Sequence, residues 1–303
     1  MPKGLLDIES LTRPEIETIL ARAKHFQPAA GQGFKRFDVS RGRTVVNLFF
    51  EASTRTRTSF EIAAKRLGAD ILSITAAGSS ISKGESLVDT LNTLAAMCPD
   101  AIVMRHSASG APHFLSRYLP VPIVNAGDGT HEHPTQALLD ALTILDRRGT
   151  LEGLRVAIIG DIAHSRVARS NIFLLSKFDV EVVLCGPAPL LPREIGRLAP
   201  GVTLTSDMEE AIRNVDVIMM LRVQLERQHE PLFPVNEYFQ FYGLRPEHIE
   251  LAKPNLIVMH PGPMNRGREI SSEVADSQRS AILNQVENGI AVRMAVLEKV
   301  LAA

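Results

Sequence analysis

Apolar residues recur along this chain at two spacings, which predict strands alternating with helices. Runs rich in β-branched and other apolar residues, typical of buried parallel strands, are found at 45–50, 70–75, 101–104, 121–124, 154–159, 180–184, 202–205, 215–221 and 256–259. Apolar residues spaced i, i+3, i+4 and i+7, as on one face of an amphipathic helix, occur between several of these runs and again near the end of the chain. The alternation predicts an α/β protein with mainly parallel sheets.

The length of the chain and one change in composition predict two domains. With 303 residues the chain exceeds the size that one hydrophobic core usually serves. Residues 146–153 are charged and contain glycine, so the boundary is expected there, and we predict two doubly wound domains over residues 1–148 and 149–281. A long polar segment of weak periodicity at 222–245 is predicted to be a lid or a binding loop.

Hydroxyl and guanidinium side chains are concentrated where the run at 45–50 passes into a helix. The residues between them are Ser53-Thr54-Arg55-Thr56-Arg57, and the helix that follows is expected to end at Gly68. Unpaired N–H groups at a helix N-terminus, together with arginine side chains, favour an oxyanion such as phosphate. Arginines at this end oppose the helix dipole by ~0.3–1 kcal/mol per charge, which disfavours a purely structural first turn.

Other polar residues are expected at the same edge of the first sheet. Arg105 follows the run at 101–104, and the carboxyl edge of an open α/β sheet is where ligands bind. His133 precedes Pro134, which is suited to the first position of a helix, so His133 and Gln136 are expected at another helix start facing this edge.

Two further motifs could be interpreted as a dinucleotide site and a metal site, but neither pattern is complete. Gly160-Asp161 follows a predicted strand, but the further glycines of a dinucleotide fingerprint are missing. His131-Glu132-His133 has two potential metal ligands at strand spacing, without a third at a recognisable spacing. We therefore expect neither NAD nor a metal.

The composition of the chain restricts the partners and the cellular location that we expect. The formal charge of −1 argues against a nucleic-acid surface, and the two distant cysteines indicate reduced thiols. Asp7 and Glu9 interrupt the N-terminal segment where a signal peptide is apolar, and no apolar run approaches the ~18 residues of a membrane span. We expect a cytoplasmic protein that binds neither nucleic acid nor membrane.

The segment Ser53–Arg57 resembles the carbamoyl-phosphate signature of the aspartate and ornithine carbamoyltransferases. Further matches follow in order over nearly the whole chain: Lys83-Gly84-Glu85, Arg105, His133-Pro134-Thr135-Gln136, Arg166, Arg222-Val223-Gln224 and His260-Pro261-Gly262-Pro263. The ornithine enzymes typically carry a cysteine in the segments equivalent to 133–136 and 260–263, and this chain has none there. The chain therefore resembles the aspartate-specific branch of the family.

The resemblance implies a role for each matched residue. Carbamoyl phosphate is expected to be bound by Ser53, Thr54, Arg55, Thr56, Ser79 (or Ser80), Arg105, His133, Gln136 and the backbone of Gly262 and Pro263. The residues expected to act on the reacting groups are Arg55, Thr56, Arg105 and His133. L-aspartate is expected to be bound by Lys83, Arg166, Arg222 and Gln224.

Charge balance supports this set independently of the family. Carbamoyl phosphate and aspartate bring about four negative charges together, and each pair ~4 Å apart costs about 4 kcal/mol at an effective dielectric constant of ~20. The matched cations that offset this repulsion are Arg55, Lys83, Arg105, Arg166 and Arg222. The aspartate amine is expected to attack the carbamoyl carbon directly, without a covalent enzyme intermediate, a metal or an organic cofactor.

The resemblance also implies a biological setting and an assembly. It implies synthesis of N-carbamoyl-L-aspartate in de novo pyrimidine biosynthesis by a homotrimer with shared active sites, in which residues 282–303 return to the first domain. A regulatory chain or a dihydroorotase is a possible partner. The alternatives are carbamoyl transfer to another amino acid such as ornithine, which the two second-half arginines disfavour, and an inactive scaffold of the same fold.

Overall fold

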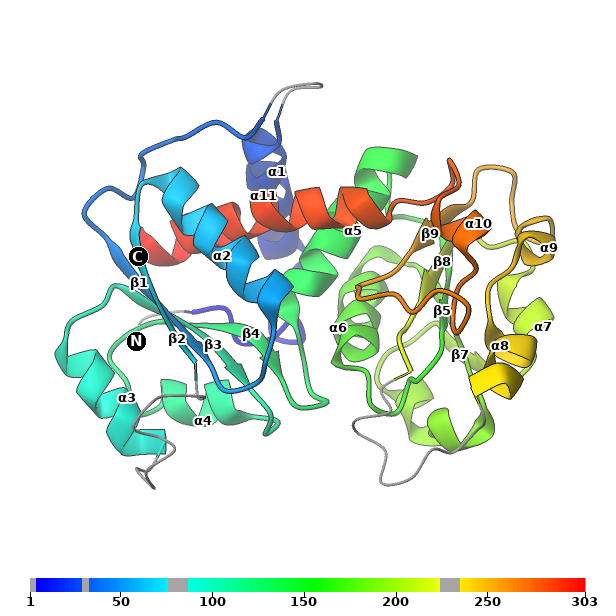
Figure 1. Ribbon diagram of the computed structural model, residues 1–303, viewed down its shortest axis with the longest axis horizontal. Helices are drawn as coiled ribbons and strands as arrows, with labels where there is room; N and C mark the ends of the chain where they lie inside the picture. Colours follow the sequence, from blue (N-terminus) through cyan, green and yellow to red (C-terminus); the bar gives the residue numbers. More distant parts are fainter. Residues whose placement is uncertain (1–3, 29–32, 76–86, 224–234, 303) are drawn as a thin grey trace. The chain divides into compact units, whose positions relative to one another are not determined.

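The structure, a computed structural model, describes residues 4–28, 33–75, 87–223 and 235–302. The chain forms two compact units, Met1–Leu139 with Glu287–Ala303 and Asp140–Val286. Each unit has its own parallel sheet with helices packed against it, which confirms the predicted α/β class (Figure 1). The division falls within α5 (Pro134–Arg148) and α11 (Ile282–Leu301).

The sheet of the first unit has the strand order β2-β1-β3-β4, with all pairs parallel. Its strands are β1 (Thr44–Phe49), β2 (Asp70–Thr75), β3 (Ala101–His106) and β4 (Ile123–Asp128). On one face, apolar residues of β1 and β3 pack against α3 (Leu87–Ala96) and α4 (Ala111–Ser116). Figure 1 shows α1 (Arg13–Phe26), α2 (Thr54–Leu67) and α11 on the other face. The short helix α4 was not predicted, because six residues are too few to show a helical period.

The first strand–helix unit follows the sequence prediction closely. β1 is buried along most of its length, and the apolar stripe of α2 is buried at Phe60, Ala63, Ala64 and Leu67. Gly68 ends α2 in the left-handed region, at φ 82°. A Cβ at Gly68 would lie 2.9 Å from the Asp38 Cα, so both the backbone angle and the close approach require glycine.

The second unit has the strand order β7-β6-β5-β8-β9, again parallel throughout. Its strands are β5 (Arg155–Ile159), β6 (Glu181–Cys185), β7 (Val202–Thr205), β8 (Val217–Met220) and β9 (Ile257–Met259), and its helices include α6 (Arg166–Leu175), α7 (Met208–Ile212), α9 (Pro246–Ile249) and α10 (Ser272–Ala275). The segment 222–245 was predicted to be a lid or a binding loop. Part of it is helical instead, since α8 (Val235–Tyr242) lies within it. Tyr238 of α8 is buried, and this tertiary packing outweighs the weak periodicity of the sequence.

The C-terminal helix packs on the first unit, as predicted. Arg22 of α1 donates two hydrogen bonds to the Glu298 carboxylate, at 2.5 and 2.6 Å. Arg293 donates to the Ser59 hydroxyl of α2 at 2.9 Å, and its guanidinium lies 5.2 Å from the centre of the Phe60 ring. These contacts join α11 to helices that precede it by more than two hundred residues.

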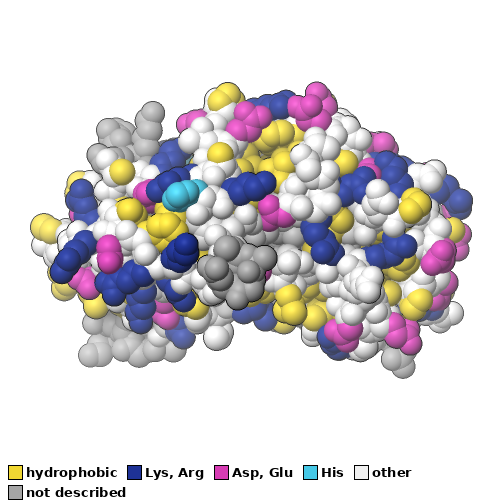
Figure 2. Space-filling model, turned by 90° about the horizontal axis from the view of Figure 1, so that it is seen from above, with side chains coloured by type: hydrophobic (Ala, Val, Ile, Leu, Met, Phe, Trp, Pro, Cys, Tyr) yellow, Lys and Arg dark blue, Asp and Glu magenta, His cyan; other side chains and the backbone are white. Residues whose placement is uncertain are grey.

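The described helices and the face drawn in Figure 2 bear on membrane and nucleic-acid binding. Among the described helices, none has the length and apolar character needed to cross a bilayer. On the face drawn in Figure 2, Lys and Arg side chains are interspersed with Asp and Glu. This mixture agrees with the formal charge of −1.

Candidate functional site

The first group of site residues lies at a topological switch point of the first sheet. From β1 the chain crosses to β2 on one side, whereas β3 lies on the other side of β1. Ligands of open α/β sheets bind beyond the carboxyl ends of two such strands. Phe49 at the end of β1 is in register with Arg105 of β3, so Ser53–Arg57 and Arg105 follow neighbouring strand ends as predicted.

Arg105 is fixed in this position by contacts from both flanking strands. Its side chain is 11% exposed; Nη2 donates to Glu51 Oε1 at 2.7 Å and Nη1 donates to the Ala126 carbonyl at 3.3 Å. The Phe50 N–H donates to the Arg105 carbonyl at 2.9 Å. A guanidinium held in this way has little rotamer freedom left to lose when an anion binds.

The segment Ser53–Arg57 forms the N-terminus of α2. Ser53 is the N-cap residue, α2 begins at Thr54, and its first turn contains no acidic residue. Thr54 and Arg55 are exposed, whereas Thr56 is buried. Helix N–H groups, hydroxyls and a guanidinium therefore meet at one helix end, which is a suitable site for a phosphate group.

His133 and Gln136 lie at the start of α5, as predicted, and both are buried. The turn before His133 is fastened at several points. The Glu132 carboxylate accepts the Ile8 and Glu9 N–H groups at 2.9 and 3.3 Å, and the Glu132 N–H donates to Asp128 Oδ1 at 3.1 Å. The N-terminal segment thus anchors the turn that carries His133.

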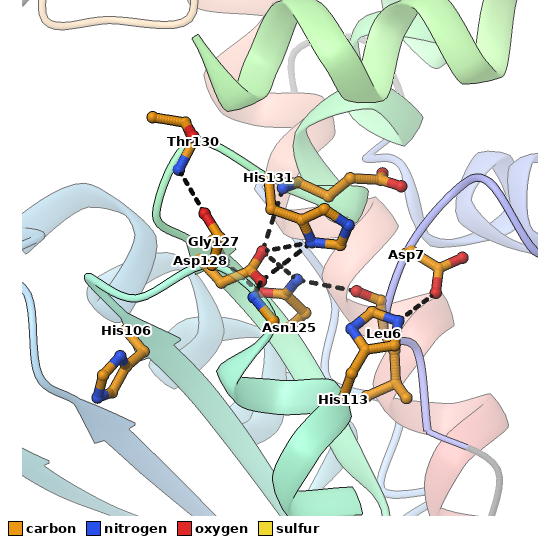
Figure 3. A network of polar contacts seen from close by, with 12 residues as sticks. Leu6, Asp7, His106, His113, Asn125, Gly127, Asp128, Thr130 and His131 are labelled. Carbon is orange, nitrogen blue, oxygen red and sulfur yellow. Dashed lines mark hydrogen bonds and ion pairs between the residues drawn. The ribbon is translucent and has the colours of Figure 1, made fainter. Parts of the chain in front are cut away.

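A network of histidines and carboxylates lies beside this turn (Figure 3). Burial alone would raise the pKa of Asp7, but hydrogen bonds from His113 and Ser10 outweigh it and hold this pKa at about 2. The hydrogen bond to Asp128 raises the pKa of His131, and the charges of Asp128 and Glu132 add to this effect. Asp7 is therefore ionised at neutral pH.

The second group of site residues lies at the corresponding switch point of the second sheet. β5 has β6 on one side and β8 on the other, so the segments after β5 and β8 share one edge. Arg166 begins α6 after β5 and is buried, with Ser165 capping the helix by accepting the Ala168 N–H at 3.1 Å. Arg222 comes directly after β8 and is half-buried.

Backbone contacts hold these two segments together. The Leu221 N–H donates to the Ile159 carbonyl at 2.7 Å. Gly160 has φ 138°, and a Cβ there would lie 2.9 Å from the Leu221 carbonyl oxygen. The glycine after β5 therefore permits a close approach of the segment that carries Arg222.

The His260–Pro263 segment follows β9 and is held by a buried histidine. The Gly262 N–H donates to His260 Nδ1 at 2.8 Å, so the proton of the neutral ring is on Nε2, which lies 3.1 Å from Glu269 Oε1. His260 and Glu269 are both fully buried. The Gly262–Pro263 peptide bond is cis and Pro263 is exposed. His260 thus has a structural role in this segment.

His260→Ala is expected to destabilise the protein by about 1–3 kcal/mol, because the buried Glu269 carboxylate loses a donor and the Gly262 N–H loses its acceptor. Urea unfolding followed by circular dichroism measures this change. The control is His25→Ala on exposed His25, for which a change within ~0.5 kcal/mol is expected. Equal unfolding midpoints for the two variants would contradict the assigned role.

Some predicted site residues are not tested by the structure, and some residues that hold the site together were not predicted. Ser79, Ser80, Lys83 and Gln224 lie outside the described residues. Sequence reasoning missed Glu51, Asp128 and Glu132, which hold Arg105 and the turn before His133. Glu51 carried a usable signal, since it stands between a strand end and Ser53–Arg57; Glu132 shows its buried partners only in the folded chain.

Comparison with models of protein families shows to which family the chain belongs. Residues 3–146 match the family model described as aspartate/ornithine carbamoyltransferase, carbamoyl-P binding domain, and residues 152–300 match the Asp/Orn binding domain of the same enzymes. The chain belongs to the aspartate/ornithine carbamoyltransferase family.

Individual relatives are similar over almost the whole chain. An aspartate carbamoyltransferase catalytic subunit of Solibacter usitatus is 77% identical over 301 residues, covering 99% of this chain and 100% of that protein. The crystal structure of Trypanosoma cruzi aspartate transcarbamoylase with N-(phosphonacetyl)-L-aspartic acid has a TM-score of 0.89 at 33% identity, covering 98% of this chain and 95% of that one. Pyrococcus furiosus ornithine carbamoyltransferase has a TM-score of 0.88 at 30% identity, with 98% and 96% covered. The fold alone therefore does not separate the two acceptors.

Proposed function

We propose that this chain catalyses transfer of the carbamoyl group from carbamoyl phosphate to the amine of L-aspartate, giving N-carbamoyl-L-aspartate and phosphate. The single observation that carries the proposal is the presence of guanidinium groups at the switch-point edges of both sheets: Arg55 and Arg105 at one, Arg166 and Arg222 at the other. Two anionic substrates need cations at both positions. The 77% identity to a catalytic subunit of this specificity supports the choice of aspartate.

Each half of the site has a distinct task in the proposed mechanism. In the first unit, Ser53, Thr54, Arg55 and Thr56 bind the phosphate, and Thr56, Arg105 and His133 donate to the carbamoyl oxygen. Negative charge grows on this oxygen as the amine attacks, so donors fixed in advance lower the barrier. Gln136 and the backbone of Gly262 and Pro263 hold the carbamoyl amine. The buried Thr56, His133 and Gln136 and the clamped Arg105 support this assignment.

Arg166 and Arg222 of the second unit bind the two carboxylates of aspartate, and Gln224 and Lys83 assist them. The amine attacks the carbamoyl carbon and the new C–N bond gives a tetrahedral intermediate; the C–O bond to phosphate then breaks, and phosphate leaves with the amine proton. Positioning two bound reactants contributes up to ~7–11 kcal/mol in well-oriented cases. We further propose residues 1–148 as the carbamoyl-phosphate domain, with 282–303 returning to it, and 149–281 as the aspartate domain.

The experiment that tests the proposed function measures phosphate release from carbamoyl phosphate with a panel of acceptors. L-aspartate is expected to give rapid release, with L-ornithine, L-lysine and L-glutamate near background. Ornithine would bring a cationic side chain to the edge that carries Arg166 and Arg222, where like charges repel. Faster release with ornithine would overturn the assignment, and no release with any acceptor would support an inactive scaffold.

We also propose that the chain works as a homotrimer with shared sites, each taking Arg55 from one chain and Lys83 from its neighbour. This arrangement follows the family resemblance and the need for a further cation beside the four arginines. The name of the relatives, catalytic subunit, is compatible with additional subunits, such as a regulatory chain or a dihydroorotase.

Mixing Arg55→Ala and Lys83→Ala subunits, each inactive alone, tests the shared site. In a cyclic ring every mixed trimer contains one junction where both residues are intact, so random exchange at equal amounts should restore about a quarter of the sites. Subunit exchange is verified by native mass spectrometry of differently tagged chains. Without any recovery after verified exchange, each chain must supply its own Lys83.

A further inference from the structure

We propose that His113, Asp128 and His131 form a binding site for a divalent transition-metal ion of the zinc class, made of residues other than the proposed substrate-binding ones and structural in role. One ligand atom from each side chain lies within 4.8 Å of the ligand atoms of the other two. Within the described part of the chain this is the one such group of three. The three residues come from α4, the end of β4 and the turn before α5 (Figure 3).

The donor set fits a borderline-soft divalent ion. Two imidazoles and one carboxylate are ligands that Zn²⁺ and Co²⁺ accept, with a water completing a tetrahedron. His131 Nδ1 lies 3.0 Å from Asp128 Oδ2, close to the ~3.4 Å between two ligands of a tetrahedral ion. Because the 4.8 Å bound exceeds this value, the third ligand, His113, has to move inward by at most roughly 1.4 Å.

His113 is oriented as a metal-binding histidine would be. Its Nε2 lies 2.6 Å from Asp7 Oδ2, so the tautomer with the proton on Nε2 donates a hydrogen bond to this carboxylate. Its Nδ1 is buried and has no hydrogen-bond partner among the described residues. In histidine–metal sites one ring nitrogen binds the ion and the other is hydrogen-bonded to a carboxylate. His113 has this arrangement, because its second ring nitrogen is directed toward Asp128 and His131 in Figure 3.

Asp128 is oriented by the surrounding backbone and side chains. Its carboxylate is fully buried and accepts hydrogen bonds from the Gly110 N–H at 2.6 Å, Asn125 Nδ2 at 2.9 Å and the Glu132 N–H at 3.1 Å. These donors fix its direction toward His131. A ligand held in this way needs little reorganisation on metal binding.

The surrounding charge favours a cation. The carboxylates of Asp7, Asp128 and Glu132 are buried together around two histidines. Gathering three carboxylates is costly unless positive charge is present, and a divalent ion supplies more of it than the imidazoles do. The site lies two residues before His133, so an ion there would brace the turn that carries this residue. The sequence analysis expected no metal, because His131 and His133 have no third ligand at a recognisable spacing; the structure brings His131 toward Asp128 and His113 instead.

The test is titration of the chelator-treated full-length protein with Co²⁺ and Zn²⁺. One ion per chain is expected, with a Co²⁺ absorption band typical of tetrahedral coordination and a higher melting temperature with Zn²⁺. His113→Gln and His131→Gln are each expected to weaken binding at least ~10-fold, and Asp7→Asn, which removes no ligand, ~10–100-fold. These readouts do not depend on the proposed enzymatic function.

The matched control is His164→Gln. His164 and Asp161 form a similar pair, with Nδ1 2.8 Å from Oδ1, a fully buried aspartate and a half-exposed histidine, but they are not in a group of three ligands among the described residues. This variant should bind Co²⁺ like the wild type. Absence of stoichiometric binding by the wild type, or full binding by both the His113 and His131 variants, would overturn the proposal. Should either variant fail to fold, X-ray absorption of the Zn²⁺-loaded wild type decides: two imidazoles support the site, and fewer exclude it.

Discussion

Arg55→Ala is expected to lower the carbamoyl-transfer rate by at least ~10²-fold while the protein stays folded. Arg55 is an exposed guanidinium at the N-terminus of α2, whose first turn contains no carboxylate. In the proposed bound state Arg55 donates to phosphate oxygens, and alanine would leave that substrate charge uncompensated. The phosphate group keeps its negative charge as it leaves. Loss of the Arg55 guanidinium therefore raises the energy of the transition state as well as weakening the binding of carbamoyl phosphate. Steady-state rates at saturating carbamoyl phosphate measure it.

A control on the same helix separates this effect from a general change of charge. Arg66 lies in the last turn of α2, at the end opposite Arg55. Arg66→Ala removes the same charge and is expected to change the rate less than twofold. Circular dichroism verifies that both variants are folded. If folded Arg55→Ala turned over near the wild-type rate, Ser53–Arg57 would not be the phosphate site.

Arg222→Ala is expected to impair the use of aspartate and to leave carbamoyl-phosphate binding nearly intact. Arg222 follows β8 at the switch point of the second sheet, beside the segment that leads to Arg166. Removing one partner of a desolvated charge pair costs about 2–5 kcal/mol, which corresponds to a decrease in kcat/KM for aspartate of roughly 30-fold to several thousand-fold. Initial rates across aspartate concentrations give this value.

Calorimetric titration with carbamoyl phosphate alone shows which half of the site Arg222 serves. The dissociation constant of the variant is expected to lie within about twofold of the wild type. Arg213→Ala is the matched control, because Arg213 is exposed before β8 whereas Arg222 follows it. A large loss of carbamoyl-phosphate affinity in Arg222→Ala would assign this arginine to the other substrate.

The strands and the long helices could be predicted from the sequence because burial imposes a period. β7 has the predicted bounds, and α2 ends at Gly68 as expected, since only the buried face of an element has to be apolar. β4 begins at Ile123 and extends to Asp128, beyond the predicted 121–124, because the buried Asn125 and Asp128 continue a strand with polar side chains. Asn125 donates to the Leu6 carbonyl, 119 residues away in the sequence, and Asp128 accepts the Glu132 N–H of the turn before α5.

The site residues could be predicted as a set, whereas the contacts that hold them could not. Arg105 stands out in the sequence as a charge at the end of an apolar run, but its contact with Glu51 depends on the register between β1 and β3. Likewise, Glu132 anchors the turn before His133 through the N–H groups of Ile8 and Glu9, more than a hundred residues away. Short polar contacts of this kind leave no periodic pattern.

The central claim is that this chain forms a bond between the carbamoyl carbon and the aspartate nitrogen, and isotope-resolved NMR tests it most directly. The purified protein is incubated with ¹³C-labelled carbamoyl phosphate and ¹⁵N-labelled L-aspartate. The carbamoyl carbon signal is expected to move to the position of a ureido carbon and to split through one-bond coupling to ¹⁵N. A carbamoyl signal that shows no ¹⁵N coupling with aspartate, or that couples only when ¹⁵N-labelled ornithine replaces aspartate, would contradict the account.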